Sequence, residues 1–492
     1  MNKEDKNIME LRKTEKITKQ VNAKVIIGIL IFSGLIATFN ETILNVALSP
    51  LMIEMNVTAG TIQWIITAYM IVVAVLVPVT AFLIQTFKTK HLYLTAMIIL
   101  LFGTICGAYS KTFTMLLISR ILQAAGTGMI IPIMMNTVLE VAPSKSRGAV
   151  MGLCGASLTL GPALGPTVAG IVLQYYQWNM LFVLLIPIII LAIIVGNIYL
   201  VNVSNITKPK IDVLSIILST ISFGGLIYGI SGFSEGLNIK LVSIIFIIGI
   251  LSLILFCKRQ LSSKEPMLDI RVFKYKKFTI ATVLVMLSMM TIFTMAVMLP
   301  MFLQGALETN TFTAAMALLP ATLISGALTP VAGKIYDKKG SRILLPTGFI
   351  IILVSLFILA HSSNDTSLIQ IILVFILLDI GVALTMSPSQ TVALSSLPKD
   401  YYPHGVAILN TLQQLASAIG SSLFIGIMSA VQLKSISNGF NEWSAVASGF
   451  NISTLVLSGF VLVAVILSMI LPVIKNKKST VSDYKSDDVI NL

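Results

Sequence analysis

The sequence predicts an all-α polytopic membrane protein with fourteen transmembrane helices and both termini in the cytoplasm. The chain of 492 residues is 56% hydrophobic and 11% charged, with a mean hydropathy of +0.95. This composition is far from that of a soluble domain. Apolar runs of about twenty residues, the length that spans a bilayer, recur with short polar breaks between them. Lysine and arginine gather in every second break, as expected when alternate loops face the cytoplasm.

The apolar runs give the spans in order along the chain. Each span begins after a polar or basic break and ends at the next one, and polar tails precede the first span and follow the last. The predicted spans lie near residues 25–47, 62–84, 92–110, 113–137, 148–172, 179–201, 212–232, 241–257, 278–302, 312–333, 343–361, 367–388, 405–430 and 453–474.

Charge sets the predicted orientation. Counted from the N-terminus, alternate loops hold 29 of the 33 lysine and arginine residues. Basic loops are retained in the cytoplasm, so both termini are placed there in a multi-pass protein of the plasma membrane. The net charge of +13 is therefore mostly a topology signal. No nucleic-acid partner is expected, because the charge is spread over eight loops and does not form one patch.

An internal repeat divides the chain into two halves. The loop GKIYDKKGSR at 333–342 follows the loop AFLIQTFKTK at 81–90 by 252 positions throughout. Equivalent loops in two six-span halves are typical of transporters built from a duplicated unit. The predicted domains are a cytoplasmic tail (1–24), an N-terminal six-helix bundle (25–201), a two-helix insertion (202–257), a cytoplasmic amphipathic linker (258–277), a C-terminal six-helix bundle (278–474) and a second cytoplasmic tail (475–492).

Several stretches resemble motifs of the major facilitator superfamily. The loop at 333–342 resembles the family's loop motif, and SRILQAAGTG at 119–128 resembles its span-4 motif. GASLTLGPALGP at 155–166 is similar to the span-5 motif typical of antiporters. NETILNVALSP at 40–50 resembles the span-1 signature of fourteen-span drug:proton antiporters of the EmrB/QacA type. Within that family the chain is most similar to the lincomycin-resistance and multidrug-export branch of Gram-positive bacteria.

Two positions depart from the family pattern. The usual acid of the span-1 signature falls at Asn40, and Glu41 stands beside it. One residue turns a side chain about 100° around a helix, so Glu41 faces a different direction from the family's acid. In the first loop motif Gln85 replaces the acid, whereas the second loop keeps Asp337.

The resemblance implies a proton-coupled antiporter that exports hydrophobic or cationic drugs by alternating access, with drugs and protons as its small-molecule partners. The alternative left open is a secondary transporter, either an exporter or a symporter, of one native metabolite or lipid. No nucleotide-binding loop or hydrolase motif occurs in the sequence, so we expect no enzyme and no cofactor, with the proton gradient as the energy source. The cysteines and histidines lack ligand spacing, so no metal site is expected. Function is not expected to require an oligomer.

Three ionisable residues lie inside the predicted spans and are the candidates for proton coupling. Glu41 and Arg120 are predicted about 9 and 10 Å below the outer surface, on two helices of one bundle. An ion pair is a low-cost way to keep both groups in the membrane, and a purely structural pair is the alternative. Asp379 lies near the midplane on the repeat counterpart of the Arg120 helix. It is expected to hold either a cationic substrate or a proton, or to be a neutral acid bonded to a neighbouring helix.

Glycine and proline alternate in the fifth span, at Gly155, Gly161, Pro162, Gly165 and Pro166. Glycines permit close helix approach, and prolines bend a helix and free backbone carbonyls. We expect a packed hinge between the two halves that limits proton leak, with ordinary small-residue packing as the alternative.

A charge cluster at the inner mouth is the candidate cytoplasmic gate. It consists of Gly333, Asp337, Lys338, Gly340 and Arg342. An aspartate at a cytoplasmic helix end is suited to hold one state of a transporter closed.

Polar and aromatic groups within or at the edges of spans are expected to line a substrate cavity, because apolar walls with few polar groups suit amphiphilic drugs. These groups are Asn40, Trp64, Tyr69, Gln123, Asn136, Asn410, Gln413 and Gln414.

Overall fold

The computed structural model describes residues 3–57, 59–143, 146–203, 206, 212–234, 238–263 and 266–471. Over these residues the chain contains helices and no strand, and fourteen of its helices are long and apolar enough to cross a membrane. All fourteen predicted spans are confirmed as helices. The predicted C-terminal tail, 475–492, lies outside the described residues.

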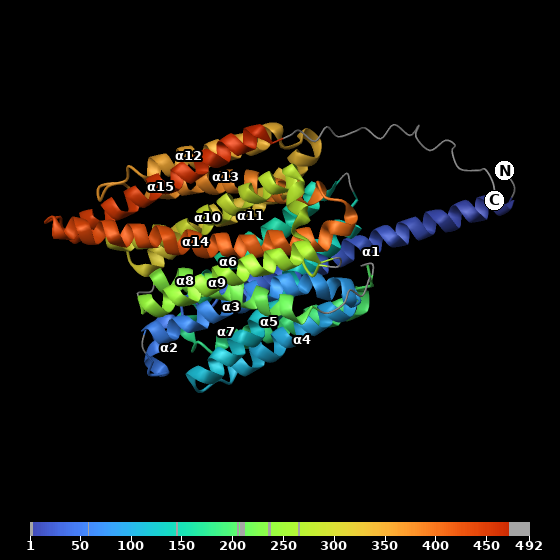
Figure 1. The fold of residues 1–492 in the computed structure, drawn as a ribbon, viewed down its shortest axis with the longest axis horizontal. Helices are drawn as coiled ribbons and strands as arrows, with labels where there is room; N and C mark the ends of the chain where they lie inside the picture. The colour runs from blue at the N-terminus through green and yellow to red at the C-terminus, as the bar shows by residue number, and fades with distance from the viewer. Residues whose placement is uncertain are drawn as a thin grey trace.

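The N-terminal bundle has six long helices, and the short helix α2 (Leu48–Glu54) lies between the first and the second of them along the chain. The six are α1 (Lys3–Thr42), α3 (Ala59–Thr86), α4 (Thr89–Ala108), α5 (Phe113–Val141), α6 (Arg147–Tyr175) and α7 (Met180–Tyr199). In Figure 1 the bundle is coloured blue to teal, and the first part of α1 extends well beyond it. The predicted tail 1–24 is thus helical from Lys3 and continuous with the first span.

The C-terminal bundle also has six long helices, coloured yellow to red in Figure 1. They are α10 (Lys276–Gly305), α11 (Thr311–Lys339), α12 (Ser341–Leu359), α13 (Leu368–Ser395), α14 (Tyr402–Ser437) and α15 (Glu442–Ile470). Short 3-10 helices, η2 (Ile270–Lys274) and η3 (Lys399–Tyr401), precede α10 and α14.

Local sequence explains several helix ends. The side chains of Thr112, Asn310 and Asn441 accept hydrogen bonds from the backbone N–H three residues later, at the starts of α5, α11 and α15. Such caps satisfy N–H groups that have no partner within the helix. The Asn441 cap begins α15 eleven residues before the predicted span. Gly340, with φ of 74°, makes the tight turn between α11 and α12.

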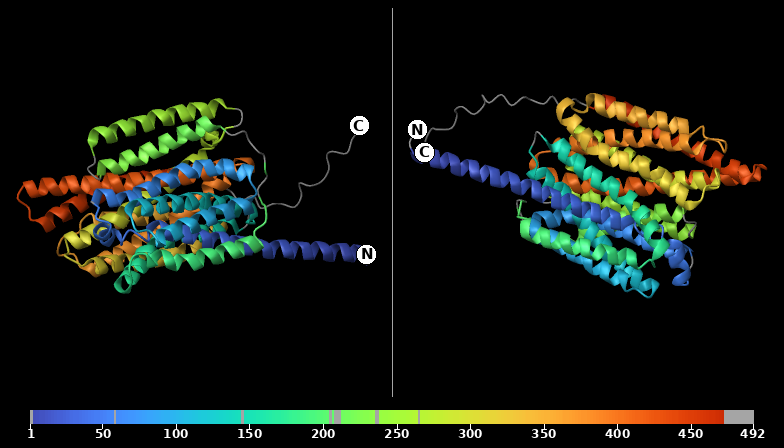
Figure 2. Two further views of the ribbon diagram at one scale, coloured as in Figure 1. Left: turned by 90° about the horizontal axis from the view of Figure 1, so that it is seen from below. Right: turned by 180° about the vertical axis from the view of Figure 1, so that it is seen from behind.

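The insertion consists of α8 (Val213–Ser234) and α9 (Ile239–Ser262). These helices pack on each other, and α8 also contacts α3 and α14, one helix from each bundle. In Figure 2 (left) they form a separate green layer along one side of the molecule. Asp212, just before the start of α8, and Arg259, in the last turn of α9, make a two-point ion pair. The insertion therefore packs against the line along which α3 and α14 of the two bundles meet.

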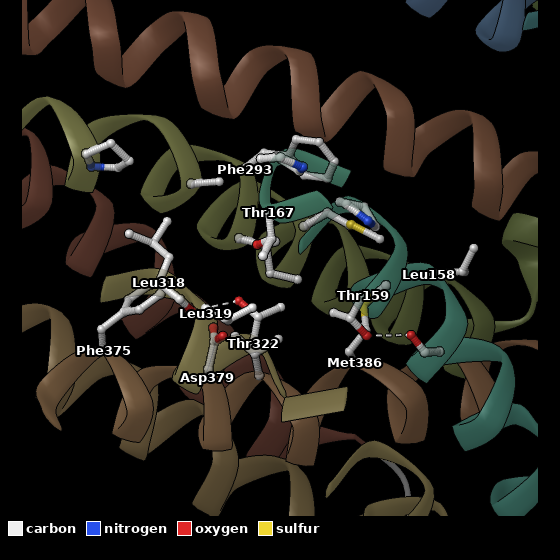
Figure 3. A pocket seen from close by; sticks show the side chains of 18 of the residues that line it. Leu158, Thr159, Thr167, Phe293, Leu318, Leu319, Thr322, Phe375, Asp379 and Met386 are labelled. Carbon is white, nitrogen blue, oxygen red and sulfur yellow. Dashed lines mark hydrogen bonds between the residues drawn. The ribbon is translucent and has the colours of Figure 1, made fainter. Parts of the chain in front are cut away.

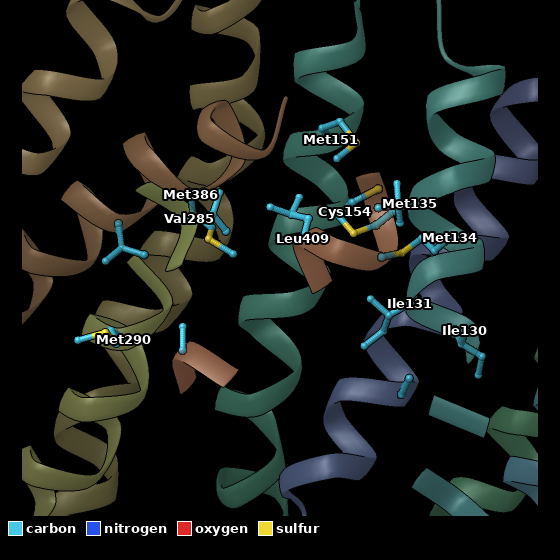
Figure 4. Packing of buried hydrophobic residues seen from close by; sticks show 14 of the residues in the cluster. Ile130, Ile131, Met134, Met135, Met151, Cys154, Val285, Met290, Met386 and Leu409 are labelled. Carbon is cyan, nitrogen blue, oxygen red and sulfur yellow. The ribbon is translucent and has the colours of Figure 1, made fainter. Parts of the chain in front are cut away.

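The two bundles meet through α6 against α11 and α13, and through α14 against α3 and α5. Sulfur-containing side chains fill part of the core near this contact (Figure 4). Met134 and Met135 of α5, with Met151 and Cys154 of α6, are completely buried, and Met386 of α13 lies across from them.

The helices alternate in direction, so the bundle has two distinct ends. We call the end where α1 enters at Ala23, and where α5 joins α6 and α11 joins α12, the basic end. The described lysines and arginines lie mainly at this end, in the part of α1 before Ala23, in the helix ends and in the connections between them. The other end is called the opposite end.

Candidate functional site

A cavity of about 260 Å³ lies between the two bundles, towards the opposite end. It is lined by α6 of the N-terminal bundle and by α10, α11 and α13 of the C-terminal bundle. Its wall is mainly apolar, with side chains such as Phe293, Leu318 and Phe375 (Figure 3). We call it the Asp379 cavity, because the Asp379 carboxylate is the one charged group among its described lining residues.

Asp379 has an unusual environment for a carboxylate. It is 8% exposed, points into the cavity beside Thr322 (Figure 3), and makes no hydrogen bond or ion pair with any described group. The Thr322 hydroxyl donates to the carbonyl of Leu318 in its own helix. A buried carboxylate without a partner is costly unless it is neutral or a cation binds it. The cavity can therefore hold an apolar body with one positive group.

A second, smaller cavity of about 50 Å³ adjoins the first. The two share Leu158, Pro162, Met289 and Phe293 in their walls. We call it the Glu41 cavity, because Glu41 of α1 is its charged lining residue. The predicted cavity residues Asn410, Gln413 and Gln414, all on α14, also line it. Both intramembrane acids thus face the space between the bundles, but in separate cavities.

Arg120 is fully buried on α5 and binds the end of α1. Its guanidinium donates to the backbone carbonyls of Asn40 at 2.9 Å and Glu41 at 3.0 Å. The last carbonyls of a helix lack intrahelical partners, and a cation there also interacts favourably with the helix dipole. Because α1 ends at Thr42, Arg120 acts as a cap for this internal helix end.

The predicted ion pair between Glu41 and Arg120 is not formed in this conformation. Among the described residues, ion pairs occur only at Asp212–Arg259 and Asp269–Arg271. The sequence interpretation placed the first span's end near residue 47, and so overlooked the free carbonyls that an α-helix ending at Thr42 presents. The guanidinium nevertheless lies next to Glu41, because it donates to the backbone carbonyl of that residue.

Three predicted cavity residues surround Arg120 and line neither cavity. The guanidinium lies 4.1 Å from the centre of the Tyr69 ring and donates to the side-chain oxygen of Gln123 at 3.0 Å. Tyr69 donates to the Thr127 hydroxyl and lies 3.5 Å from the amide nitrogen of Asn40. Gln123 in turn donates to the Thr104 hydroxyl of α4. Groups from α1, α3, α4 and α5 thereby fix the position of the Arg120 guanidinium.

The other two predicted cavity residues lie elsewhere. Trp64 packs against Tyr228 of the insertion, with ring centroids 5.5 Å apart. Asn136 is 1% exposed within α5 and lines neither cavity.

The predicted hinge packs mainly against α1 of its own bundle. A Cβ atom added at Gly161 or Gly165 would collide with Thr38 or Thr42. The Thr42 hydroxyl donates to the carbonyl of Pro162 at 3.3 Å. That carbonyl would normally accept from residue 166, but proline has no N–H. The hinge therefore contacts the turn of α1 that carries Glu41.

A different part of α6 contacts the other bundle. Gly152 and Gly155 face Thr329 of α11, and Gly155 also approaches Ser387 of α13. The whole hinge motif was expected to form the contact between the two halves. Of its residues, Gly155 makes that contact, whereas Pro162 and Pro166 border the Asp379 cavity.

The basic end is closed by a contact between α6 and α11. The two carboxylate oxygens of Asp337 accept hydrogen bonds from the backbone N–H groups of Gly148 and Ala149, each at 2.8 Å. These N–H groups lie in the first turn of α6, where a negative charge is favourable. A Cβ atom at Gly333 would collide with the Gly148 carbonyl, so the helices touch through their backbones.

The remaining gate residues contribute less to this closure. Lys338 and Arg342 are exposed and make no ion pair with a described group. Arg147, which the sequence analysis did not select, donates to the Tyr402 hydroxyl of α14 at 3.0 Å and makes a second bond between the bundles. The sequence analysis also did not select Thr38 and Thr42 of α1, against which Gly161 and Gly165 pack. Their i, i+4 spacing, which places both on one face of the helix beside Glu41, was a signal available in the sequence.

Comparison with known proteins agrees with this architecture. The model of the major facilitator superfamily matches residues 30–421. The chain belongs to the major facilitator superfamily. It is 42% identical to the lincomycin resistance protein LmrB of Bacillus subtilis, covering 86% of this chain and 89% of that protein. It is 41% identical to LmrB of Listeria monocytogenes, covering 83% and 87%.

A solved structure shares the fold. The human organic anion transporter MFSD10 superposes with a TM-score of 0.65 at 11% identity, covering 91% of this chain and 99% of that one. At this identity the likeness concerns the fold alone. Family and fold together make the chain a multi-pass transporter of the cell membrane.

Proposed function

We propose that this transporter exports hydrophobic or cationic drugs, lincosamides among them, in exchange for protons. The observation that carries the proposal is the unpartnered Asp379 carboxylate in an otherwise apolar cavity between the bundles. An apolar wall favours an apolar drug body, and a buried acid favours a positive charge. The names of the relatives support drug export, since two of them are lincomycin resistance proteins.

Orientation follows from the positive-inside rule. The basic end then faces the cytoplasm, with both termini on that side. The contact of Asp337 with the start of α6 closes the cytoplasmic side, and the Asp379 cavity lies towards the outer side. Export requires a second state in which this contact is broken and the cavity is reached from the cytoplasm.

The two intramembrane acids, Glu41 and Asp379, support exchange of substrate for protons. Each proton that enters across 100 mV supplies about 2.3 kcal/mol, enough to drive a substrate against its gradient. We assign that proton to Glu41, which lines a cavity between the bundles and lies beside the buried charge of Arg120.

The test is substrate-triggered proton flux in energised inverted membrane vesicles. Lincosamides, ethidium and quaternary ammonium compounds are added one at a time to wild type, Glu41→Gln and Asp379→Asn. We expect a collapse of the proton gradient with wild type, no collapse with Glu41→Gln, and loss of the response to cations alone with Asp379→Asn. A wild-type protein that is folded but never dissipates the gradient would contradict proton exchange. Normal export of every cation by Asp379→Asn would contradict the role of Asp379.

A further inference from the structure

The two adjoining cavities differ in size and lining in a way that separates what each can hold. A water molecule occupies roughly 10–15 Å³ of such a volume. The Glu41 cavity, of about 50 Å³, therefore holds a few waters and is too small for a drug, whereas the Asp379 cavity is about five times larger. The Phe293 and Met289 side chains of α10, with Leu158 and Pro162 of α6, form the boundary between them.

The Glu41 cavity has a polar side formed by α14, which belongs to the other bundle. Asn410 and Gln413, both 5% exposed, line it one turn apart. The amide nitrogens of both residues are buried and donate to no group within the described chain. The two residues that carry these unused donors therefore line a water-sized space together with Glu41. Unsatisfied buried donors are costly, so a partner such as bound water is expected there.

We propose that the Glu41 cavity is a hydrated proton site, in which the amides of Asn410 and Gln413 hold the ionised Glu41 carboxylate through bridging water, while the substrate is confined to the Asp379 cavity. When ionised, Glu41 connects α1 of one bundle to α14 of the other. Protonation removes charge from the acceptor and weakens this connection. The inference rests on the proposed proton exchange and names the residues that would link protonation to movement of the bundles.

Two further groups face Glu41 and belong to the same electrostatic environment. Arg120 of α5 binds the carbonyl of Glu41, and Tyr69 of α3 lies against the guanidinium. Within the described chain, the hydrogen bonds and the ring contact of Arg120 and Tyr69 involve only α1, α3 and α5, so we expect both groups to remain in place when α14 is altered. Variants of α14 therefore change the donors without removing the cation.

The experiment is a pH titration of the Glu41 carboxyl by infrared difference spectroscopy in nanodiscs. The protonated carboxyl band is identified by its absence in Glu41→Gln. The tested variants are Asn410→Leu and Gln413→Met, which remove an amide and nearly keep its volume. Because hydrogen bonds to the charged form favour that form, each variant should raise the titration midpoint by about one pH unit.

A matched control is Gln390→Met on α13. Gln390 is also a completely buried amide without a partner among the described residues, but it lines neither cavity. Its midpoint should equal that of wild type. Binding of tetraphenylphosphonium is measured in parallel: it should stay within twofold of wild type in both α14 variants, which also shows that they fold, and be lost in Asp379→Asn.

The outcomes separate this inference from the proposed function. Midpoints that stay unchanged or fall in both α14 variants would overturn the hydrated proton site, even where wild type shows drug-triggered proton flux. Loss of tetraphenylphosphonium binding in folded Gln413→Met would overturn the confinement of substrate to the Asp379 cavity. If wild type shows no drug-triggered flux but the midpoints rise as expected, the proposed exchange fails and the proton site remains.

Discussion

Replacing Asp337 by asparagine should open the basic end. In the structure the carboxylate accepts two hydrogen bonds of 2.8 Å from the first turn of α6. Asparagine keeps one acceptor oxygen and loses the charge. The change therefore removes one charge-assisted bond, worth about 1.5–3 kcal/mol, and a helix-dipole interaction of about 0.3–1 kcal/mol. Asp337 is only partly buried, so we take the lower part of the combined range, about 2 kcal/mol.

A change of about 1.4 kcal/mol shifts an equilibrium tenfold. We therefore expect Asp337→Asn to raise the ratio of open to closed molecules at the basic end by roughly ten- to thirtyfold. The ratio can be measured by pulsed electron spin resonance, with spin labels at Glu140 of α5 and the exposed Lys338 of α11. The three native cysteines are first replaced so that only these sites are labelled.

The matched control is Asp400→Asn, an exposed aspartate at the same end for which no hydrogen bond is found in the described chain. This variant should give the same distance distribution as the parent protein. A distribution for Asp337→Asn that matches the parent would refute the reasoning, because the carboxylate would then contribute nothing to closure. If both variants opened the basic end to the same extent, the cause would be a general effect of charge and not the hydrogen bonds of Asp337.

Three other perturbations have defined outcomes. Gly161→Val should lower the thermal unfolding temperature, since overpacking costs about 1–3 kcal/mol, whereas Gly170→Val on the same helix, with open space around its Cβ position, should change it little. Arg120→Lys loses the fork that reaches two carbonyls and should reduce the yield of folded protein in size-exclusion chromatography; wild-type yield would contradict its capping role. Hydrogen bonds from Arg259 lower the pKa of Asp212 to about 2. The stabilisation of the start of α8 by these hydrogen bonds is thus fully present above about pH 4 and is lost as the pH falls towards 2. Hydrogen exchange of the first amides of α8 measures this loss, and unchanged protection at pH 2 would contradict it.

The fold was largely predictable because each span is a continuous apolar run of bilayer length. Span boundaries agree within a few residues except where polar residues continue a helix, as in the start of α15 at Glu442. The end of α1 at Thr42 was not predictable in this way, since the chain stays apolar to Leu48 and hydropathy does not distinguish a helix from the turns that follow.

The site was predicted less completely. The acids Glu41 and Asp379 are recognisable because a charge inside a span is rare. Their separation into two cavities depends on Phe293 and Met289, which look like ordinary core residues in the sequence. The partner of Asp337 is the backbone of α6, which carries no side-chain signal at all.

The internal repeat explains why the two acids line different cavities. In the N-terminal bundle Gly165 of α6 packs on Thr42 of α1, and in the C-terminal bundle Gly420 of α14 packs on Thr294 of α10. The residue before Thr42 is Glu41, and the residue before Thr294 is Phe293, 252 positions later, at the offset of the repeated loops. Equivalent positions thus place an acid in one half and a phenyl ring in the other, and both border the Glu41 cavity. A symmetric pair of acids would place two carboxylates in the Glu41 cavity. The phenyl ring instead gives this water-sized cavity an apolar wall, and the second acid, Asp379, lies on a different helix of the repeat and lines the larger cavity, as the proposed separation of proton and substrate requires.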